Sequence, residues 1–153
     1  MRSVLVFFLL LAAACGPSPE PNPGAPDSAT LEIRTDAGVR SFDVEVADTS
    51  TERRTGLMGR ETLSPYDGMA FVWARPVQSS FWMKDTLIPL SIAFWDQEGR
   101  IVSILDMEPC RVDPCPTYGP DAPYVGAVEV RQGELERHGV GVGDTVDLTL
   151  RGA

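Results

Sequence analysis

The chain has 153 residues with 22 acidic and 13 basic side chains, so its net charge is −9, and Lys84 is its single lysine. A chain this acidic is a poor non-specific binder of nucleic acid or of an anionic membrane surface. A zinc hydrolase gathers three or four His, Cys or carboxylate ligands in one place, whereas this chain has one histidine and no cysteine that we expect to remain a free thiol.

Residues 1–14, MRSVLVFFLLLAAA, place one arginine before an apolar run and predict a secretory signal peptide. The run is shorter than the ~20 residues that a transmembrane helix needs. The small residues before Cys15 resemble the lipobox of bacterial lipoproteins, which implies that Cys15 is acylated. An ordinary signal peptide that leaves Cys15 as a thiol is the alternative, because Ala12 stands where lipoboxes usually carry leucine. We therefore expect an exported lipoprotein, anchored to a membrane by its N-terminal lipid and facing the periplasm or the cell exterior.

Residues 15–28 are expected to form a tether behind the acylated cysteine. Residues 16–28, GPSPEPNPGAPDS, contain five of the 13 prolines and no large apolar side chain, so they cannot pack a core. An extended segment of about 3.1 Å per residue would reach on the order of 40 Å. Residues 29–153 are then left for one domain with its own core.

Short strand patterns dominate this domain. Leu31 and Ile33, and then Phe42, Val44 and Val46, alternate with polar residues on either side of the turn-like DAG, which predicts a β-hairpin. Further strands are predicted at MAFVW, SFWM, PLSIAFW, IVSILDM, YVGAVEV and TVDLTL, with a tight turn at DQEG. This pattern predicts a mainly β fold, a single-domain sandwich or a jelly-roll-like barrel.

Two short helices are expected between the strands. Thr49 stands three residues before Glu52, which is the spacing of a capping box, and Gly56 and Gly59 are expected to end this helix within about two turns. The second helix lies in QGELERHG and is expected to end at Gly139.

Cys110 and Cys115 are the two cysteines that remain if Cys15 carries lipid. They lie close together in a proline-rich stretch, and outside the cytoplasm such cysteines usually form a disulfide. The loop-entropy model gives this small ring roughly 2 kcal/mol of stabilisation. A redox-active pair is the alternative, although the familiar active spacing has two intervening residues rather than four.

Five blocks follow one another in a recognisable order: TERRTGLMGRETL, DGMAFVW, SFWMKDTLIPLSIAFWDQEGRIVSI, EPC and GELERHGVGVGDTV. Together they resemble the bacterial and archaeal family named domain of unknown function 192, over nearly all of residues 40–150. The resemblance implies a compact β-rich domain of the sandwich or jelly-roll kind, and it implies no established activity. The family usually has asparagine where this chain has Asp85. An amide both donates and accepts hydrogen bonds, whereas an ionised carboxylate only accepts them.

The block FWMKDT holds the single lysine. If it is a strand, Trp82, Lys84 and Thr86 share one face, because side chains alternate along a strand. A stacking ring, an ammonium and a hydroxyl together predict the floor of a site for a polar or sugar-like ligand. An edge-strand lysine that discourages aggregation is the alternative. Arginine occupies every other basic position, so a lysine here indicates a need for a compact ammonium.

Arginines of the first helix and its exit are expected near the same face. With Lys84 they would form a cationic spot suited to a small anion or a carboxylated ligand. Ion pairs with Glu52 or Asp85 would cancel that charge, and a structural ion-pair network is the alternative. We thus expect a non-catalytic binding or accessory domain. Its candidate site residues are Arg53, Arg54, Arg60, Trp82, Lys84, Asp85 and Thr86.

Two other functions remain open at this point. An enzyme acting on an envelope carbohydrate would need two carboxylates about 5 to 10 Å apart. The candidates are Glu52, Asp67, Asp85 and Asp96. A copper-handling protein would use thioether sulfurs, although methionines within apolar blocks are typical of core filling. The methionines concerned are Met58, Met69 and Met83.

A Ser-His-Asp triad is disfavoured, because His138 falls in the last turn of a predicted helix, where it can interact with the helix dipole. The glycine run GVGVGD precedes a predicted strand rather than a helix, which argues against a phosphate-binding loop. For the binding domain that we expect, no bound cofactor and no metal centre are predicted.

Overall fold

The computed structural model describes residues 27–64 and 66–151. The expected signal peptide, the lipidation site Cys15 and the tether up to residue 26 lie outside them. The first strand begins at Ser28, and the carbonyl of Asp27 already accepts a hydrogen bond from the Val46 amide at 2.6 Å. The described part contains no helix with the length and apolar character that crossing a bilayer requires.

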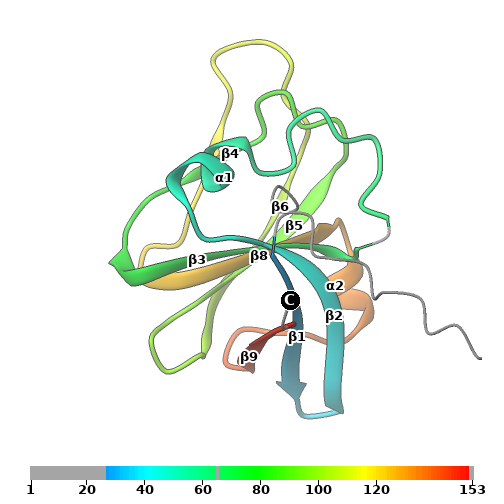
Figure 1. Ribbon diagram of the computed structural model, residues 1–153, viewed down its shortest axis with the longest axis vertical. Coiled ribbons are helices and arrows are strands. Elements are labelled where there is room, and N and C mark those ends of the chain that lie inside the picture. Colours follow the sequence, from blue (N-terminus) through cyan, green and yellow to red (C-terminus); the bar gives the residue numbers. More distant parts are fainter. Residues whose placement is uncertain (1–26, 65, 152–153) are drawn as a thin grey trace, which may run out of the picture.

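Nine strands and two short helices form within the described residues, as the sequence predicts for a mainly β domain (Figure 1). The strands are β1 (Ser28–Thr35), β2 (Gly38–Ala47), β3 (Gly68–Val77), β4 (Phe81–Trp82), β5 (Leu90–Trp95), β6 (Ile101–Met107), β7 (Thr117–Tyr118), β8 (Tyr124–Arg131) and β9 (Thr145–Leu150). The helices are α1 (Ser50–Thr55) and α2 (Glu134–Arg137).

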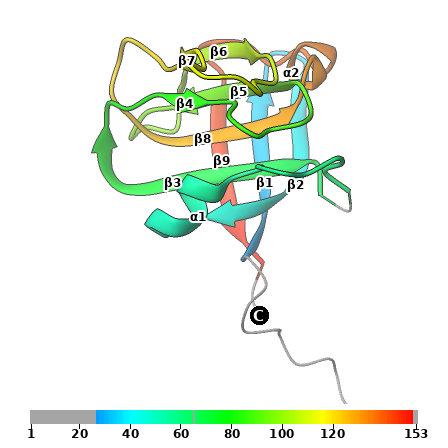
Figure 2. The ribbon, with the colours of Figure 1, turned by 90° about the horizontal axis from the view of Figure 1, so that it is seen from above.

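Seven strands form one sheet in the order β6-β5-β8-β3-β2-β1-β9, and β4 pairs with β7 in a separate two-stranded sheet. The predicted hairpin is confirmed, because β1 and β2 pair along their whole length from Ser28↔Glu45 to Thr35↔Gly38. The pairing of β2 with β3 is parallel. The sheet bends strongly, so that β1, β2 and β9 cross over one side of β8 and β5 (Figure 2). Its edges meet at the bridge Arg100↔Thr145 without closing into a barrel.

Both faces of the central strands are buried, because each packs against its own apolar cluster. All six residues of β5, LSIAFW, are buried. Ala93 and Trp95 join the cluster formed with β1 and β2. Ile92 and Phe94 join the second cluster on the opposite face. A strand that is covered on both sides reads as a continuous apolar run, which explains why PLSIAFW shows no alternation.

Helix α1 lies in the crossover between the parallel strands β2 and β3. Its predicted capping box is confirmed: the Thr49 hydroxyl accepts from the Glu52 amide at 3.2 Å, and the Glu52 carboxylate accepts from the Thr49 amide at 3.0 Å. These hydrogen bonds hold the pKa of Glu52 below its usual value. Gly56 ends the helix at φ +45°, a conformation that favours glycine, and a Cβ there would stand 3.4 Å from the Phe71 ring. The end of α1 is thereby fixed against β3.

The loop after β6 is closed by the predicted disulfide, Cys110–Cys115, whose Cα atoms are 5.8 Å apart. This loop supports the segment that follows β4. The Cys110 amide donates to the Met83 carbonyl and the Asp85 amide donates to the Cys110 carbonyl, each at 3.1 Å. Phe81 pairs with Tyr118 in β7. The predicted strand SFWM is therefore only two residues long, because the chain then turns to meet the disulfide loop.

Candidate ligand-binding site

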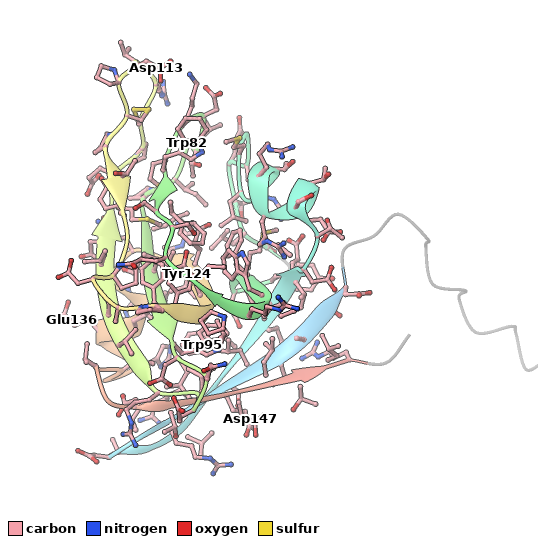
Figure 3. The ribbon with its side chains drawn as sticks, turned by 90° about the vertical axis from the view of Figure 1, so that its left-hand side faces the viewer. Trp82, Trp95, Asp113, Tyr124, Glu136 and Asp147 are labelled. Atoms are coloured by element: carbon pink, nitrogen blue, oxygen red, sulfur yellow. A yellow bond between two sulfur atoms is a disulfide. The ribbon has the colours of Figure 1, made fainter. Side chains whose placement is uncertain are left out.

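A narrow slot opens between α1 and the segment 81–86. Its cavity volume is about 30 Å³, which is room for one or two water-sized groups. A wider outer groove of about 390 Å³ shares four lining residues with the slot and so continues it toward solvent: Arg53, Arg54, Phe81 and Trp82. Figure 3 shows Trp82 beside α1, with the disulfide loop and Asp113 beyond it.

Glu129 is the acidic residue that lines the slot. It stands on β8 opposite Met69 of β3 and Ile92 of β5, so its strand neighbours on this face are apolar. The residue is 4% exposed, and burial raises the pKa of its carboxyl group to about 8. The carboxyl group has no hydrogen-bond partner among the described residues. In this part of the chain, no side-chain oxygen that lacks a partner is sealed from solvent, so the oxygens of Glu129 must be open to solvent. The Glu129 oxygens therefore face the slot.

The walls of the slot are aromatic. The rings of Phe71 and Phe81 meet edge to face at 5.0 Å. Trp82 is 48% exposed, so one large ring stands at the mouth in contact with solvent. Thr86 is 5% exposed and adds a second buried polar side chain to the lining. The slot thus places two buried polar groups behind an aromatic entrance.

Two arginines of α1 lie at the rim shared by the slot and the groove. Arg53 donates to the carbonyl of Val72 at 2.8 Å and to that of Asp48, and its guanidinium lies 5.1 Å from the centre of the Trp73 ring. These contacts fix the Arg53 side chain at the rim. Arg54 is exposed. The slot is therefore acidic at its floor and basic at its rim.

The other two predicted cations line neither the slot nor the outer groove, and both are held in ion pairs. Arg60 pairs with the buried carboxylate of Glu45, with one contact at 2.8 Å, and this hydrogen bonding raises the Arg60 pKa. Lys84 pairs with Asp113 of the disulfide loop, chiefly by a hydrogen bond that raises the lysine pKa. Its ammonium also lies 5.9 Å from the centre of the Trp82 ring. The expected cationic spot of three arginines and a lysine is thus reduced to Arg53 and Arg54.

The predicted strand alternation across FWMKDT is wrong. Phe81 and Trp82 both line the slot, and Asp85 adopts φ +56°, so the chain leaves the extended conformation before Thr86. Lys84 bridges to Cys110 in place of continuing a strand. Thr86 reaches the slot through this turn, because its amide donates to the Met83 carbonyl at 3.1 Å.

Asp85 stands in the left-handed region, which accounts for a short polar side chain at this position. Asparagine and aspartate tolerate this conformation better than other non-glycine residues. The backbone is held there by its own contacts, since the Asp85 carbonyl accepts from the Gly59 amide at 2.8 Å and its amide binds Cys110. The family's asparagine and this aspartate are therefore equivalent for the backbone. Lys84 does not need the Asp85 carboxylate, because Asp113 is its partner.

We predict that Asp85→Asn leaves stability and ligand binding nearly unchanged. Asp85→Ala should lower the free energy of unfolding by roughly 1 kcal/mol, because alanine tolerates a positive φ less well than aspartate or asparagine. Urea unfolding of both variants measures the difference. Asp85→Gly is the matched control and should be tolerated better than alanine. Equal losses for asparagine and alanine would show that the carboxylate itself matters.

The acids expected for a carbohydrate-acting enzyme do not gather in the slot. Glu52 caps α1. Asp96 accepts from the amides of Glu98 at 3.1 Å and Arg100 at 2.8 Å in the confirmed turn between β5 and β6. Asp67 lines a different groove from Glu129. None of the four expected acids lines the slot or its outer groove.

The methionines divide between core and slot. Met69 and Met83 are buried in the second apolar cluster, at 4% and 1% exposure, which is the core-filling role. Met58 lines the slot. Within the described residues, no group of three or more histidine, cysteine or acidic side chains is placed to hold a metal ion.

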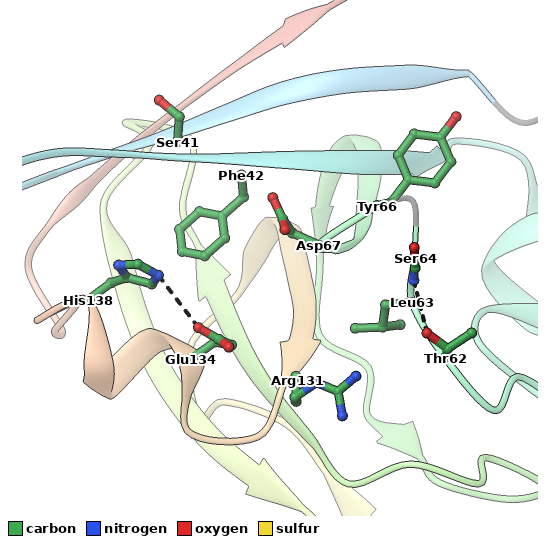
Figure 4. Close-up of a pocket in the computed structure, with 10 residues that line it drawn as sticks. All are labelled: Ser41, Phe42, Thr62, Leu63, Ser64, Tyr66, Asp67, Arg131, Glu134 and His138. Carbon is green, nitrogen blue, oxygen red and sulfur yellow. Dashed lines mark hydrogen bonds and ion pairs between the residues drawn. The ribbon is translucent and has the colours of Figure 1, made fainter.

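A separate groove, of about 390 Å³, lies between β2, residues 62–64 and 66–67, and α2. Figure 4 shows Asp67 between its two ends, with Phe42, His138 and Glu134 at one of them. His138 is 3.5 Å from Glu134 and meets the Phe42 ring edge to face at 5.4 Å. The Asp67 carboxylate accepts from the Asp43 amide at 2.8 Å. Glu134, His138 and Asp67 of this groove therefore have local partners, in contrast to Glu129.

Comparison with known proteins gives a family and two similar structures. The sequence model of DUF192, described as Uncharacterized ACR, COG1430, matches residues 31–148. A protein from Sinorhizobium meliloti 1021, provisionally named a transcription regulator, is 26% identical with a TM-score of 0.75, covering 83% of this chain and 98% of its own. A protein of unknown function from Novosphingobium aromaticivorans DSM 12444 is 30% identical, also with a TM-score of 0.75, covering 88% of this chain and 94% of its own. No curated protein matches the chain.

Proposed function

Because the chain belongs to the DUF192 family, which is described as uncharacterized, we propose a function from the site itself: the domain binds a small polar ligand in the slot between α1 and the segment 81–86. The observation that carries this proposal is the carboxyl group of Glu129 at the slot floor, which belongs to a buried residue and has no hydrogen-bond partner among the described residues. Because its oxygens open into the slot and bond to no described residue there, they are free to bind a polar ligand.

The composition of the slot favours binding over hydrolysis. Glu129 is the one carboxyl group that lines the slot and outer groove of the described structure. Hydrolysis of a glycosidic bond usually requires two carboxyl groups within about 5 to 10 Å of each other. A single acid next to a hydroxyl and an exposed indole ring instead suits recognition, in which the ring stacks on the ligand and the polar groups orient it.

We further propose that the domain works outside the cytoplasm, anchored by an acylated Cys15 and separated from the membrane by the tether. The disulfide supports this location, because such bonds persist in oxidising compartments. Replacing Cys15 with serine should move the protein from the membrane fraction to the soluble fraction. Unchanged membrane association would refute the lipid anchor without affecting the slot.

A thermal-shift screen of the purified full-length protein in detergent tests ligand binding. The probes are neutral sugars, small carboxylic acids, amines and amino acids. A ligand at 100 times its dissociation constant stabilises by about 2.7 kcal/mol. We expect the shift to be lost in Trp82→Ala and Thr86→Val, and kept in Lys84→Ala, the matched control whose ion pair lies outside the slot. A ligand that still shifts the melting temperature of Trp82→Ala and Thr86→Val would refute the proposed site.

A further inference from the structure

The charges of the slot have a fixed order. Glu129 is the innermost charged residue, and the other two in the lining, Arg53 and Arg54, stand at the rim that the slot shares with the outer groove. The remaining lining side chains are apolar or neutral. A ligand that enters past the arginines and touches Glu129 therefore meets positive charge first and an acid last.

The inner end suits an ammonium group better than a hydroxyl group. Glu129 and Thr86, the two buried polar side chains, offer three oxygen acceptors, and an ammonium has three donors and no acceptor. The faces of Phe71, Phe81 and Trp82 carry negative charge density that attracts a cation. A cavity of about 30 Å³ is also matched to one small head group.

The rim suits an anionic group. Arg54 is exposed there, and a guanidinium binds carboxylate in a two-pronged geometry. Arg53 already donates to carbonyl groups and lies against the Trp73 ring. It therefore adds positive charge to the rim but has fewer free hydrogen-bond donors for a ligand. Neither arginine is paired with the Glu129 carboxyl group, whose pKa is set by burial alone.

We infer that the slot binds an amino acid-like zwitterion, with its ammonium on Glu129 and Thr86 and its carboxylate on Arg54. This inference rests on the proposed binding function and names its ligand class. In the empty slot Glu129 holds its proton below pH 8. Binding the ammonium requires the ionised acid, so that proton is released to solvent as the ion pair forms. No covalent step is involved.

Isothermal titration of the full-length protein in detergent with glycine, β-alanine, 4-aminobutyrate, 5-aminopentanoate and lysine tests the inference. The best binder is then compared with two analogues, one lacking its amino group and one lacking its carboxylate. We expect each analogue to bind at least tenfold more weakly. Affinity for the zwitterion should rise on the order of tenfold per pH unit up to about pH 8, the pKa of Glu129.

Two substitutions separate the two ends of the ligand. Glu129→Gln should abolish the pH dependence and weaken binding of the zwitterion and of the amine analogue. Arg54→Ala should weaken binding of the zwitterion and leave binding of the analogue that lacks a carboxylate unchanged. Arg137 is an exposed arginine of α2, and Arg137→Ala should change the binding of neither.

The outcomes distinguish the inference from the proposed function. If a neutral sugar bound, lost affinity in Glu129→Gln and bound more weakly as pH rises, the zwitterion inference would be wrong. The slot would still be a binding site. Binding of a zwitterion that is insensitive to Glu129→Gln and Trp82→Ala, or the absence of any binding across sugars, acids, amines and amino acids, would overturn both.

Discussion

Glu129→Gln increases the free energy of unfolding at pH 8 by an expected ~4 kcal/mol, and changes it little at pH 4. The unfolded carboxyl group titrates near 4.5 and the folded one near 8. Between these values the native state holds a proton that the unfolded state has lost, so the stability of the wild type falls as pH rises. Glutamine resembles the protonated acid in shape and does not titrate, so the variant lacks this decline.

Urea unfolding at pH 4, 6 and 8 measures this effect. Glu136→Gln is the matched control, because Glu136 is an exposed glutamate on α2, and it should keep the wild-type slope. If Glu129→Gln instead lost stability at every pH, the carboxylate would have a structural partner and would not be a vacant ligand group. The expected result means that the chain retains an acid in its core at the cost of stability, which is typical of a functional position.

Arg60→Ala is expected to destabilise the protein by about 3–5 kcal/mol. The side chain of Glu45 on β2 is 4% exposed, and Arg60 pairs with it through both of its terminal nitrogens. Removing the guanidinium leaves a buried carboxylate without its counter-charge, which is among the most costly single changes in a protein interior. The loss should appear as a lower midpoint of denaturation with an unchanged slope.

Two variants bracket this prediction. Lys84→Ala breaks the exposed pair with Asp113 and should cause no substantial loss, because solvent screens such pairs. The double variant Glu45→Gln/Arg60→Met should recover most of the stability, since it removes both charges together. A small loss in Arg60→Ala would mean that solvent reaches Glu45 once the arginine is gone.

The fold was largely predictable because its signals are local. Alternation around DAG identified the β1–β2 hairpin, and the Thr49 to Glu52 spacing identified the start of α1. The strand β7 was missed, since Thr117–Tyr118 is two residues long and exists through its pairing with β4. The extended conformation expected through Lys84 failed for a related reason, because contacts with Cys110 turn the chain there.

The site was predicted in part. Arg53, Arg54, Trp82 and Thr86 do line the slot, whereas Arg60 and Lys84 have ion-pair partners 15 and 29 residues away in sequence. Such pairings depend on the tertiary fold and leave no local pattern. Glu129 was missed, although a signal was present. In YVGAVEV, Glu129 lies two residues after Ala127 and therefore on the same face of the strand. Because nearly all other side chains of this strand are apolar, the sequence predicts that its carboxyl group is buried.

The titration of Glu129 itself is the decisive measurement. Carbon-13 NMR of the side-chain carboxyl groups, with Glu129→Gln to assign the signal, gives its midpoint in the ligand-free protein. We predict a midpoint of about 8, and a midpoint that moves to lower pH when an ammonium-bearing ligand saturates the slot. A midpoint near the ordinary value of 4.5 would contradict it, because the carboxyl group would then be solvated or already paired.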